Sequence, residues 1–321
     1  MFKTMLRAGL ALVAMLVHGA AWAGADNCYD AADAAQVRLW DGAAPGAVGA
    51  DPCRDIPYLR VFPAARPGGG AILLIPGGGY DRLTDAQEQA PVAEYFSRQL
   101  NLTTFVLYYR LVQSDGSYRY RVPMWDGQRA LKLIRHRAAE WRVDPSRIAL
   151  FGFSAGGHLA STLALHPRDD FGRPRDAAVD AIDRSDGRPD LLGLGYPVIS
   201  MDPAQTGASS SHNHLLHGYR GAELARLEDY LSGQKQVGTG MVPVFLFESL
   251  DDARISAQNS VLFAQALQAA GVPADVHLFA HGVHGAGLAT HIPQEQAWPE
   301  LFHQWLIAQH FVPAQTDSPR R

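Results

Sequence analysis

Short apolar segments alternate along this chain with longer segments whose apolar residues recur at helical spacing. The short segments predict strands at residues 58–62, 71–75, 103–109, 148–151, 191–196, 243–248 and 275–279. The longer segments predict helices at residues 86–100, 126–141, from 157 onward, 257–270 and 295–311. This alternation indicates an α/β fold with a mostly parallel, doubly wound sheet and helices on both faces. The carboxyl ends of the strands then meet at one edge, where ligands bind.

A long polar segment, residues 201–240, interrupts this alternation. Insertions of this length between strands commonly form lids or binding loops, so we expect a lid-like insertion. Its three histidines, His212, His214 and His217, could be interpreted as a metal site. Their spacing fits no closed structural site and no acidic or thiol partner stands nearby, which favours a solvated segment and predicts no metal.

The N-terminus has the three parts of a secretory signal peptide. Lys3 and Arg7 precede a short apolar segment at 10–17, and small residues at 21 and 23 end it. We expect cleavage after Ala23 and export to the periplasm or beyond, because the apolar segment is shorter than the roughly 20 residues of a membrane anchor. The predicted organisation is a signal peptide at 1–23, an N-terminal arm at 24–56, an α/β domain at 57–313 and a disordered tail at 314–321.

Composition narrows the class of protein further. The chain has 321 residues and a formal charge of −4, without a long block of one sign, so nothing indicates a nucleic-acid partner. Its only two cysteines are Cys28 and Cys53, and in an oxidising compartment they form a candidate disulfide. Two free thiols are the alternative.

The most informative segment is GFSAG at residues 152–156, between a predicted strand and a predicted helix. A G-x-S-x-G sequence in that context is the signature of a nucleophile elbow, with Ser154 as the nucleophile. The backbone N–H of Ala155 and the helix N-terminus then face the position of a developing oxyanion. The alternative is a glycine-rich turn that happens to contain a serine.

A serine nucleophile needs a histidine base and an orienting carboxylate, in the chain order Ser, Asp or Glu, His in this fold. The loop after the strand at 243–248 offers Asp251 and Asp252, and the loop after the strand at 275–279 offers His281 and His284. We favour His284, since glycines follow it and allow its ring a close approach, and Asp252, since it begins an Asp-x-x-Ile step that leads into the next helix.

Three consecutive glycines at 77–79 follow an earlier predicted strand. A plain turn explains them poorly, so Gly78 and Gly79 are candidate second donors to the oxyanion. Tyr80 beside them is a candidate for stacking on the substrate.

Other noticeable residues have ordinary interpretations. Four of them are expected to be structural, by local packing or capping, polar contacts or core burial: His158, Arg110, Asp126 and Tyr109. Trp125 is likewise expected to be buried in the core.

Several motifs together resemble a known family. They are IPGGGY at 75–80, VLYYRL at 106–111, the segment 126–160 with DGQRAL and DPSRI, YPVISM at 196–201 and HGVHGAGL at 281–288. Over about residues 37–309 the chain resembles the α/β-hydrolase superfamily. More narrowly, it resembles the bacterial acetyl-xylan and feruloyl esterase-like group, which is related to prolyl-oligopeptidase-type hydrolases.

The resemblance implies a serine esterase without a cofactor that removes acetyl or feruloyl groups from carbohydrate. It implies the triad Ser154, Asp252 and His284, with Gly78, Gly79 and Ala155 around the oxyanion. The group usually has a proline where this chain has Ala253, and the segment 209–218 is individual to this chain.

Three alternatives differ in function. A prolyl-oligopeptidase-like peptidase would bring a large additional domain, for which 321 residues leave no space. A lipase-like esterase would take longer acyl chains. A non-catalytic binding module on a hydrolase scaffold would have no physical reason to keep the serine, acid, histidine and glycine turn together.

Overall fold

The computed structural model describes residues 27–66, 69–84, 86–175, 177–207 and 209–314. Eight strands form one sheet in the order β1-β2-β4-β3-β5-β6-β7-β8. In chain order the strands are β1 Gln36–Arg38, β2 Tyr58–Phe62, β3 Ala71–Ile75, β4 Thr103–Tyr108, β5 Ile148–Phe153, β6 Leu191–Gly195, β7 Val244–Ser249 and β8 Ala274–Phe279. Strand β2 pairs antiparallel with β1 and β4, and every other neighbouring pair is parallel. The predicted signal peptide and residues 315–321 lie outside the described residues.

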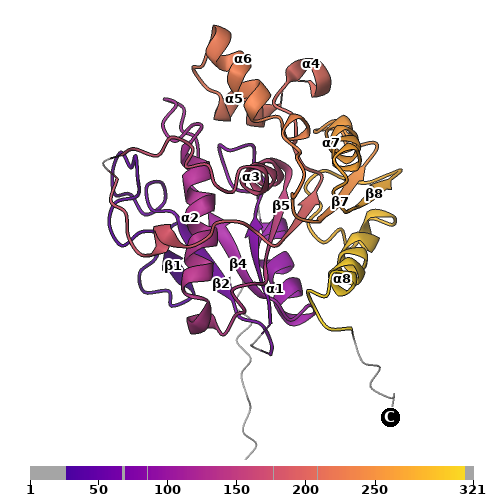
Figure 1. Ribbon diagram of the computed structural model, residues 1–321, viewed down its shortest axis with the longest axis horizontal. Helices are drawn as coiled ribbons and strands as arrows, with labels where there is room; N and C mark the ends of the chain where they lie inside the picture. Colours follow the sequence, from indigo (N-terminus) through magenta and orange to yellow (C-terminus); the bar gives the residue numbers. More distant parts are fainter. Residues whose placement is uncertain (1–26, 67–68, 85, 176, 208, 315–321) are drawn as a thin grey trace, which may run out of the picture.

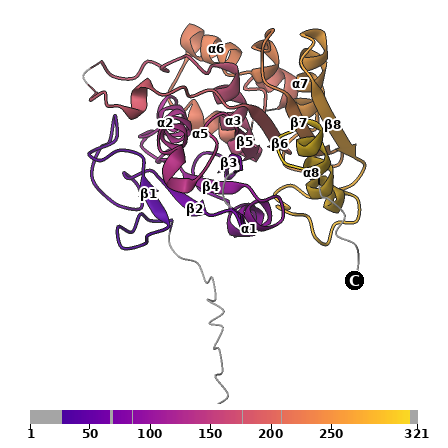
Figure 2. The same cartoon turned by 60° about the horizontal axis from the view of Figure 1, so that its bottom comes forward.

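Helices cover both faces of the sheet (Figure 2). One face carries α1 Ala90–Arg98 and α8 Trp298–Ala308, and the other carries α2 Val122–His136, α3 Ser154–Leu165 and α7 Gln258–Ala269. Aromatic rings join the first layer to the sheet, since Phe96 of α1 and Phe302 of α8 both contact Phe151 of β5. Strands β3 to β7 are buried along their whole length, as expected where helices shield both faces.

The predicted strands agree with the structure to within two residues, whereas the helix bounds differ more. Helix α1 begins at Ala90 and not at 86, α3 begins at Ser154 and not at 157, and α8 spans Trp298–Ala308 and not 295–311. Helix α2 begins at Val122, four residues before the predicted start at 126, with Pro123 in its first turn. Proline suits that position because the first N–H groups of a helix have no intrahelical acceptor. The pattern missed β1 altogether. Its three residues are only partly exposed and carry no clear alternation, so only pairing with β2 reveals it as a strand.

The predicted insertion folds into three short helices, which Figure 1 shows together at one end of the molecule. They are α4 Pro203–Thr206, α5 Ser210–Leu215 and α6 Gly221–Tyr230. The side chains of Asp202 and Ser209 cap α4 and α5 respectively. Helix α5 lies against the glycine turn, because His214 Nδ1 is 2.8 Å from the carbonyl oxygen of Gly79.

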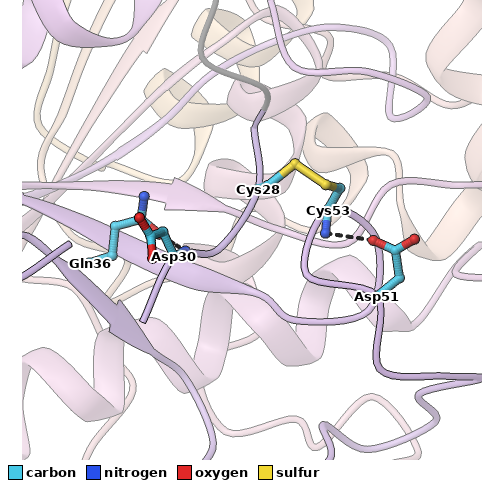
Figure 3. The surroundings of a disulfide bond; sticks show 5 residues. All are labelled: Cys28, Asp30, Gln36, Asp51 and Cys53. Atoms are coloured by element: carbon cyan, nitrogen blue, oxygen red, sulfur yellow. Dashed lines mark hydrogen bonds between the residues drawn. A yellow bond between two sulfur atoms is a disulfide. The ribbon is translucent and has the colours of Figure 1, made fainter. Parts of the chain in front are cut away.

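A disulfide joins Cys28 to Cys53, the pairing expected from the sequence (Figure 3). Beside it the N–H of Tyr29 donates to the carbonyl of Pro52 at 2.9 Å. The disulfide therefore closes a loop within the 27–56 arm, and the arm is held to the domain where Tyr118 Oη donates to Asp55 at 2.5 Å. In the described part of the chain, no helix is long and apolar enough to cross a bilayer.

Candidate active site

The turn from β5 into α3 presents Ser154 at the carboxyl edge of the sheet. Ser154 has a φ of 51°, an unusual left-handed conformation for a residue with a side chain. The flanking glycines permit the tight turn. A Cβ at Gly152 would lie 2.2 Å from the carbonyl oxygen of Gly156, and one at Gly156 would lie 2.2 Å from that of Ile75. The strained turn therefore depends on the G-x-S-x-G pattern itself.

Three side chains from three loops meet in a hydrogen-bonded row. His284 Nε2 is 2.9 Å from Ser154 Oγ, and His284 Nδ1 is 2.6 Å from Asp252 Oδ2. The serine and histidine are 130 residues apart, and the histidine and aspartate are 32 apart. The arrangement has the geometry of a nucleophile, its base and the carboxylate that orients the base.

Asp252 lies in a setting that keeps it ionised. Burial opposes ionisation, but hydrogen bonds from His284 and from the backbone outweigh it and lower the pKa of Asp252. The backbone donors are the N–H groups of Arg254 at 2.7 Å and Ile255 at 2.9 Å, both to Oδ1. The carboxylate can therefore fix the orientation of the imidazole.

The glycine turn lies beside the elbow. Gly78 and Gly79 have φ values of 119° and 66°, conformations that glycine adopts without strain. Within the described residues, neither of their backbone N–H groups donates a hydrogen bond, whereas the N–H of Gly77 donates to Glu88. Gly78, Gly79 and Ala155 thus remain the candidate oxyanion donors, since Ala155 lies in the first turn of α3, where N–H groups lack intrahelical acceptors.

A cleft of about 610 Å³ opens over Ser154 and His284. Its lining is more polar than apolar and combines residues of the glycine turn with residues of the insertion. Besides Ser154 and His284, the polar residues that line it are Arg82, Thr84, Gln87, Glu88, Ser209, Ser210, Ser211 and Arg254. A cleft with this lining suits a substrate rich in hydroxyl groups better than a long alkyl chain.

Tyr80 does not contact this cleft, and the expectation that it stacks on the substrate is wrong. Its ring is fully buried, and its hydroxyl lies 2.6 Å from His158 Nδ1. His158 Nε2 in turn lies 2.9 Å from the carbonyl of Leu231. Burial lowers the pKa of His158 to about 4, so this histidine is neutral at physiological pH and ties the turn to α3.

The residues interpreted as structural are buried or paired in the structure. Arg110 and Asp126 form a buried ion pair with a closest distance of 2.6 Å, and Tyr109 and Trp125 are buried in the core. The insertion histidines differ from the expectation in one respect, because His212 has an acidic partner, Glu228, at 2.8 Å. His214 points elsewhere, to the carbonyl of Gly79. Over the described ranges, no group of three or more potential ligands could hold a metal ion.

Two buried residues at the site were missed by the sequence analysis. Glu88 receives hydrogen bonds from the N–H of Gly77 and from Tyr196 Oη. Tyr196 also accepts a hydrogen bond from the N–H of Gly287, near His284. Glu88 has no signal in the sequence, because it precedes an ordinary apolar helix. Tyr196 lies at the carboxyl end of a predicted strand. Because ligands bind at that edge of the sheet, its position could have marked it as a candidate site residue.

Comparison with known proteins identifies relatives of this chain. The family model BD-FAE matches residues 64–267. The chain is 33% identical over 219 residues to endo-1,4-beta-xylanase B of Butyrivibrio fibrisolvens, covering 68% of this chain and 33% of the relative. It is 28% identical over 247 residues to an acetylxylan esterase of Xylanibacter ruminicola, covering 76% and 47% respectively. The chain thus spans about a third to a half of the length of these curated relatives.

Solved structures show the same fold over nearly their whole length. An acetyl ester-xyloside bifunctional hydrolase from Caldicellulosiruptor lactoaceticus matches with a TM-score of 0.75 and 32% identity, covering 86% of this chain and 97% of that one. A carboxylesterase from Lactobacillus plantarum matches with a TM-score of 0.68 and 26% identity, covering 87% and 98%. The fold is therefore that of the α/β-hydrolase esterases.

Proposed function

Because the chain belongs to the BD-FAE family, we propose that it is a serine esterase that hydrolyses carboxylic esters of carbohydrates. The observation that carries this proposal is the hydrogen-bonded row Ser154–His284–Asp252, of which Ser154 and His284 line a polar cleft. The matched relatives that are named as an acetylxylan esterase and as a hydrolase of acetyl esters and xylosides support the same class of reaction.

In the first half of the reaction, Ser154 Oγ attacks the ester carbonyl while His284 Nε2 takes its proton. Asp252 holds the ring by its Nδ1 side and stabilises the imidazolium. The N–H groups of Ala155, Gly78 and Gly79 stabilise the tetrahedral oxyanion. His284 then protonates the leaving alcohol, which departs and leaves an acyl group on Ser154.

In the second half, water enters the position vacated by the alcohol. His284 removes a proton from this water, which attacks the acyl carbonyl. The same N–H groups stabilise the oxyanion that forms. Collapse of the intermediate releases the acid and returns the proton to Ser154. Every step uses a group of this chain.

The substrate that we propose is an acetyl ester of a plant polysaccharide, with a feruloyl ester as the second candidate. The polar side chains around the cleft can bind sugar hydroxyls, and the names of the xylan-related relatives point the same way. We also propose export, which the signal-like residues 1–23 and the disulfide between Cys28 and Cys53 support.

The test measures initial rates of the mature protein on p-nitrophenyl esters of increasing acyl length, on acetylated xylan and on methyl ferulate. We expect rapid acetate release that falls steeply with acyl length, and loss of this activity in Ser154→Ala. Preference for ferulate would reassign the substrate to feruloyl esters, and preference for long chains would indicate a lipase-like enzyme. Absence of hydrolysis on every ester would overturn the proposal and favour a peptidase or a binding module. Cell fractionation with N-terminal sequencing tests export.

A further inference from the structure

A buried carboxyl group lies between the two loops that the proposed reaction needs. Glu88 ends the 3-10 turn Ala86–Glu88, which follows the glycine turn in sequence, and its side chain is fully buried. Its Oε2 accepts a hydrogen bond from the N–H of Gly77 at 2.7 Å. Gly77 immediately precedes Gly78, so this bond fixes the start of the segment that carries the oxyanion donors.

The other oxygen of Glu88 connects to the histidine loop through Tyr196. Tyr196 Oη donates to Glu88 Oε1 at 2.9 Å and accepts from the N–H of Gly287 at 3.1 Å. The tyrosine ring also contacts the ring of His284, with centroids 5.0 Å apart. Tyr196 has a φ of 35°, a left-handed conformation that is costly for a residue with a side chain and persists only where its surroundings hold it.

Packing alone does not explain a carboxyl group at this position. Burial raises the pKa of Glu88, although hydrogen bonds from the Gly77 N–H, the Tyr196 hydroxyl and Thr84 favour its ionised form. Among the described residues, no lysine or arginine forms an ion pair with it. An apolar side chain would fill the same space without this desolvation cost, so the hydrogen bonds are what the carboxylate adds.

We propose that Glu88 is a positioning residue that, together with Tyr196, holds the glycine turn and the His284 loop in register over Ser154. This inference rests on the proposed esterase function. Its physical reason is geometric, since oxyanion donors act only when they lie at hydrogen-bond distance from the position that the oxyanion will occupy. Displacement of either loop weakens interactions that form in the transition state and leaves binding of the ground-state ester nearly unchanged.

Glu88→Gln tests the link with little change in volume. The Gly77 N–H and the Tyr196 hydroxyl donate to different oxygens of Glu88. The amide presents an NH2 group at one of these positions, so the Tyr196 hydroxyl can no longer donate there if the Gly77 bond is kept, and the negative charge is lost. We expect kcat on p-nitrophenyl acetate to fall about 10- to 100-fold while KM stays within about twofold. Affinity for a methyl trifluoromethyl ketone, which forms an oxyanion on the serine, should fall in parallel with kcat/KM.

Tyr196→Phe is the second variant, because it keeps the ring against His284 and removes only the hydroxyl. We expect the same separation of kcat from KM, and a double variant with Glu88→Gln that loses less than the product of the two single losses. Tyr118→Phe is the matched control. It also removes a buried tyrosine–carboxylate hydrogen bond, to Asp55, but in the N-terminal arm. We expect its kcat, KM and inhibitor affinity to equal those of the wild type.

The outcomes separate a positioning role from a structural one. If Glu88→Gln and Tyr196→Phe lower the melting temperature as Tyr118→Phe does, yet keep wild-type kcat and inhibitor affinity, the inference is wrong and the proposed function stands. If Glu88→Gln fails to fold, the result of Tyr196→Phe decides. If the wild type hydrolyses no ester and its rates equal those of Ser154→Ala, both the proposed function and this inference are wrong.

Discussion

Two Asp–His pairs lie side by side between the same two loops, and they differ mainly in burial. In one pair His284 Nδ1 is 2.6 Å from Asp252, and the two side chains are 12% and 1% exposed. In the other His281 Nδ1 is 2.9 Å from Asp251, and the side chains are 77% and 48% exposed. Both pairs use the same atoms and a similar hydrogen bond. Only His284 continues to a third group, Ser154.

The comparison teaches that an Asp–His hydrogen bond alone does not mark a base for catalysis. The exposed pair braces its loop, since Asp251 also accepts from the N–H of Gly282 at 2.9 Å. Water competes for its hydrogen bonds and screens the charge of Asp251, so the pair contributes little to stability or to the reaction. The buried pair is shielded from water, and its ring is held at hydrogen-bond distance from a nucleophile. The surroundings, more than the residue types, distinguish the two.

The largest expected effect comes from removing each histidine in turn. His284→Ala should lower kcat/KM on p-nitrophenyl acetate about 10⁴-fold or more, because Ser154 loses its base. His281→Ala should change it by no more than about twofold, as for an exposed ion pair. Initial-rate kinetics on the two purified variants check this. A greater loss in His281→Ala than in His284→Ala would reverse the assignment of the base.

Removing the charge of the buried carboxylate should also lower kcat more than removing that of the exposed one. Asp252→Asn keeps the shape of the side chain but removes the charge that orients and stabilises the imidazolium, and we expect a loss of about 10³- to 10⁴-fold in kcat. Asp251→Asn should stay within about threefold, since its partner is exposed. The comparison is made by steady-state kinetics at fixed pH. Equal losses in the two variants would mean that both pairs serve the reaction.

A glycine between the two histidines offers a smaller disturbance of both pairs. A Cβ at Gly282 would lie 1.8 Å from Ser249 Oγ and 2.7 Å from Ser249 Cβ. Rotation of the serine side chain cannot relieve the second contact, so Gly282→Ala must displace the loop. We expect kcat to fall about 10- to 100-fold, as for a misplaced catalytic group, and stability to fall by about 1–3 kcal/mol. Urea unfolding together with kinetics measures both. Wild-type kcat in this variant would show that the position of His284 tolerates loop movement.

The smallest expected effect is on the pH dependence of stability. Burial raises the pKa of Glu248, next to the buried pair, from its ordinary value of 4.5 to about 8. The folded protein therefore keeps a proton that the unfolded chain has already released, and stability falls as pH rises from about 4.5 to 8. Burial likewise raises the pKa of Glu295 to about 7, with the same sign.

Glu248→Gln should remove its share of that fall, at least about 1 kcal/mol between pH 5 and pH 8. Urea unfolding at a series of pH values measures it. Asp251→Asn is the control and should keep the wild-type slope of stability against pH. The pKa of Asp251 is lowered, so this carboxylate does not titrate in this range. An unchanged slope in Glu248→Gln would show that Glu248 is ionised throughout.

Much of this protein follows from its sequence alone. Apolar segments such as residues 71–75 and 148–153 must be shielded from water on both faces, which determines the layered α/β fold. The G-x-S-x-G pattern determines the elbow, because a Cβ at either glycine would lie only 2.2 Å from a backbone carbonyl oxygen. The chain order of serine, aspartate and histidine then predicts the three residues that meet.

Other features depend on contacts between distant segments, which local patterns do not encode. The sequence offered Tyr80 for substrate binding, and the fold buried it against His158, 78 residues away. It gave no sign of Glu88, whose partner Tyr196 is 108 residues away. It offered two aspartates and two histidines and favoured Asp252 and His284, and the tertiary structure buries that pair and leaves the other exposed. Local sequence determines which backbone conformations form, whereas burial and the partners of a side chain are decided only when the whole chain folds.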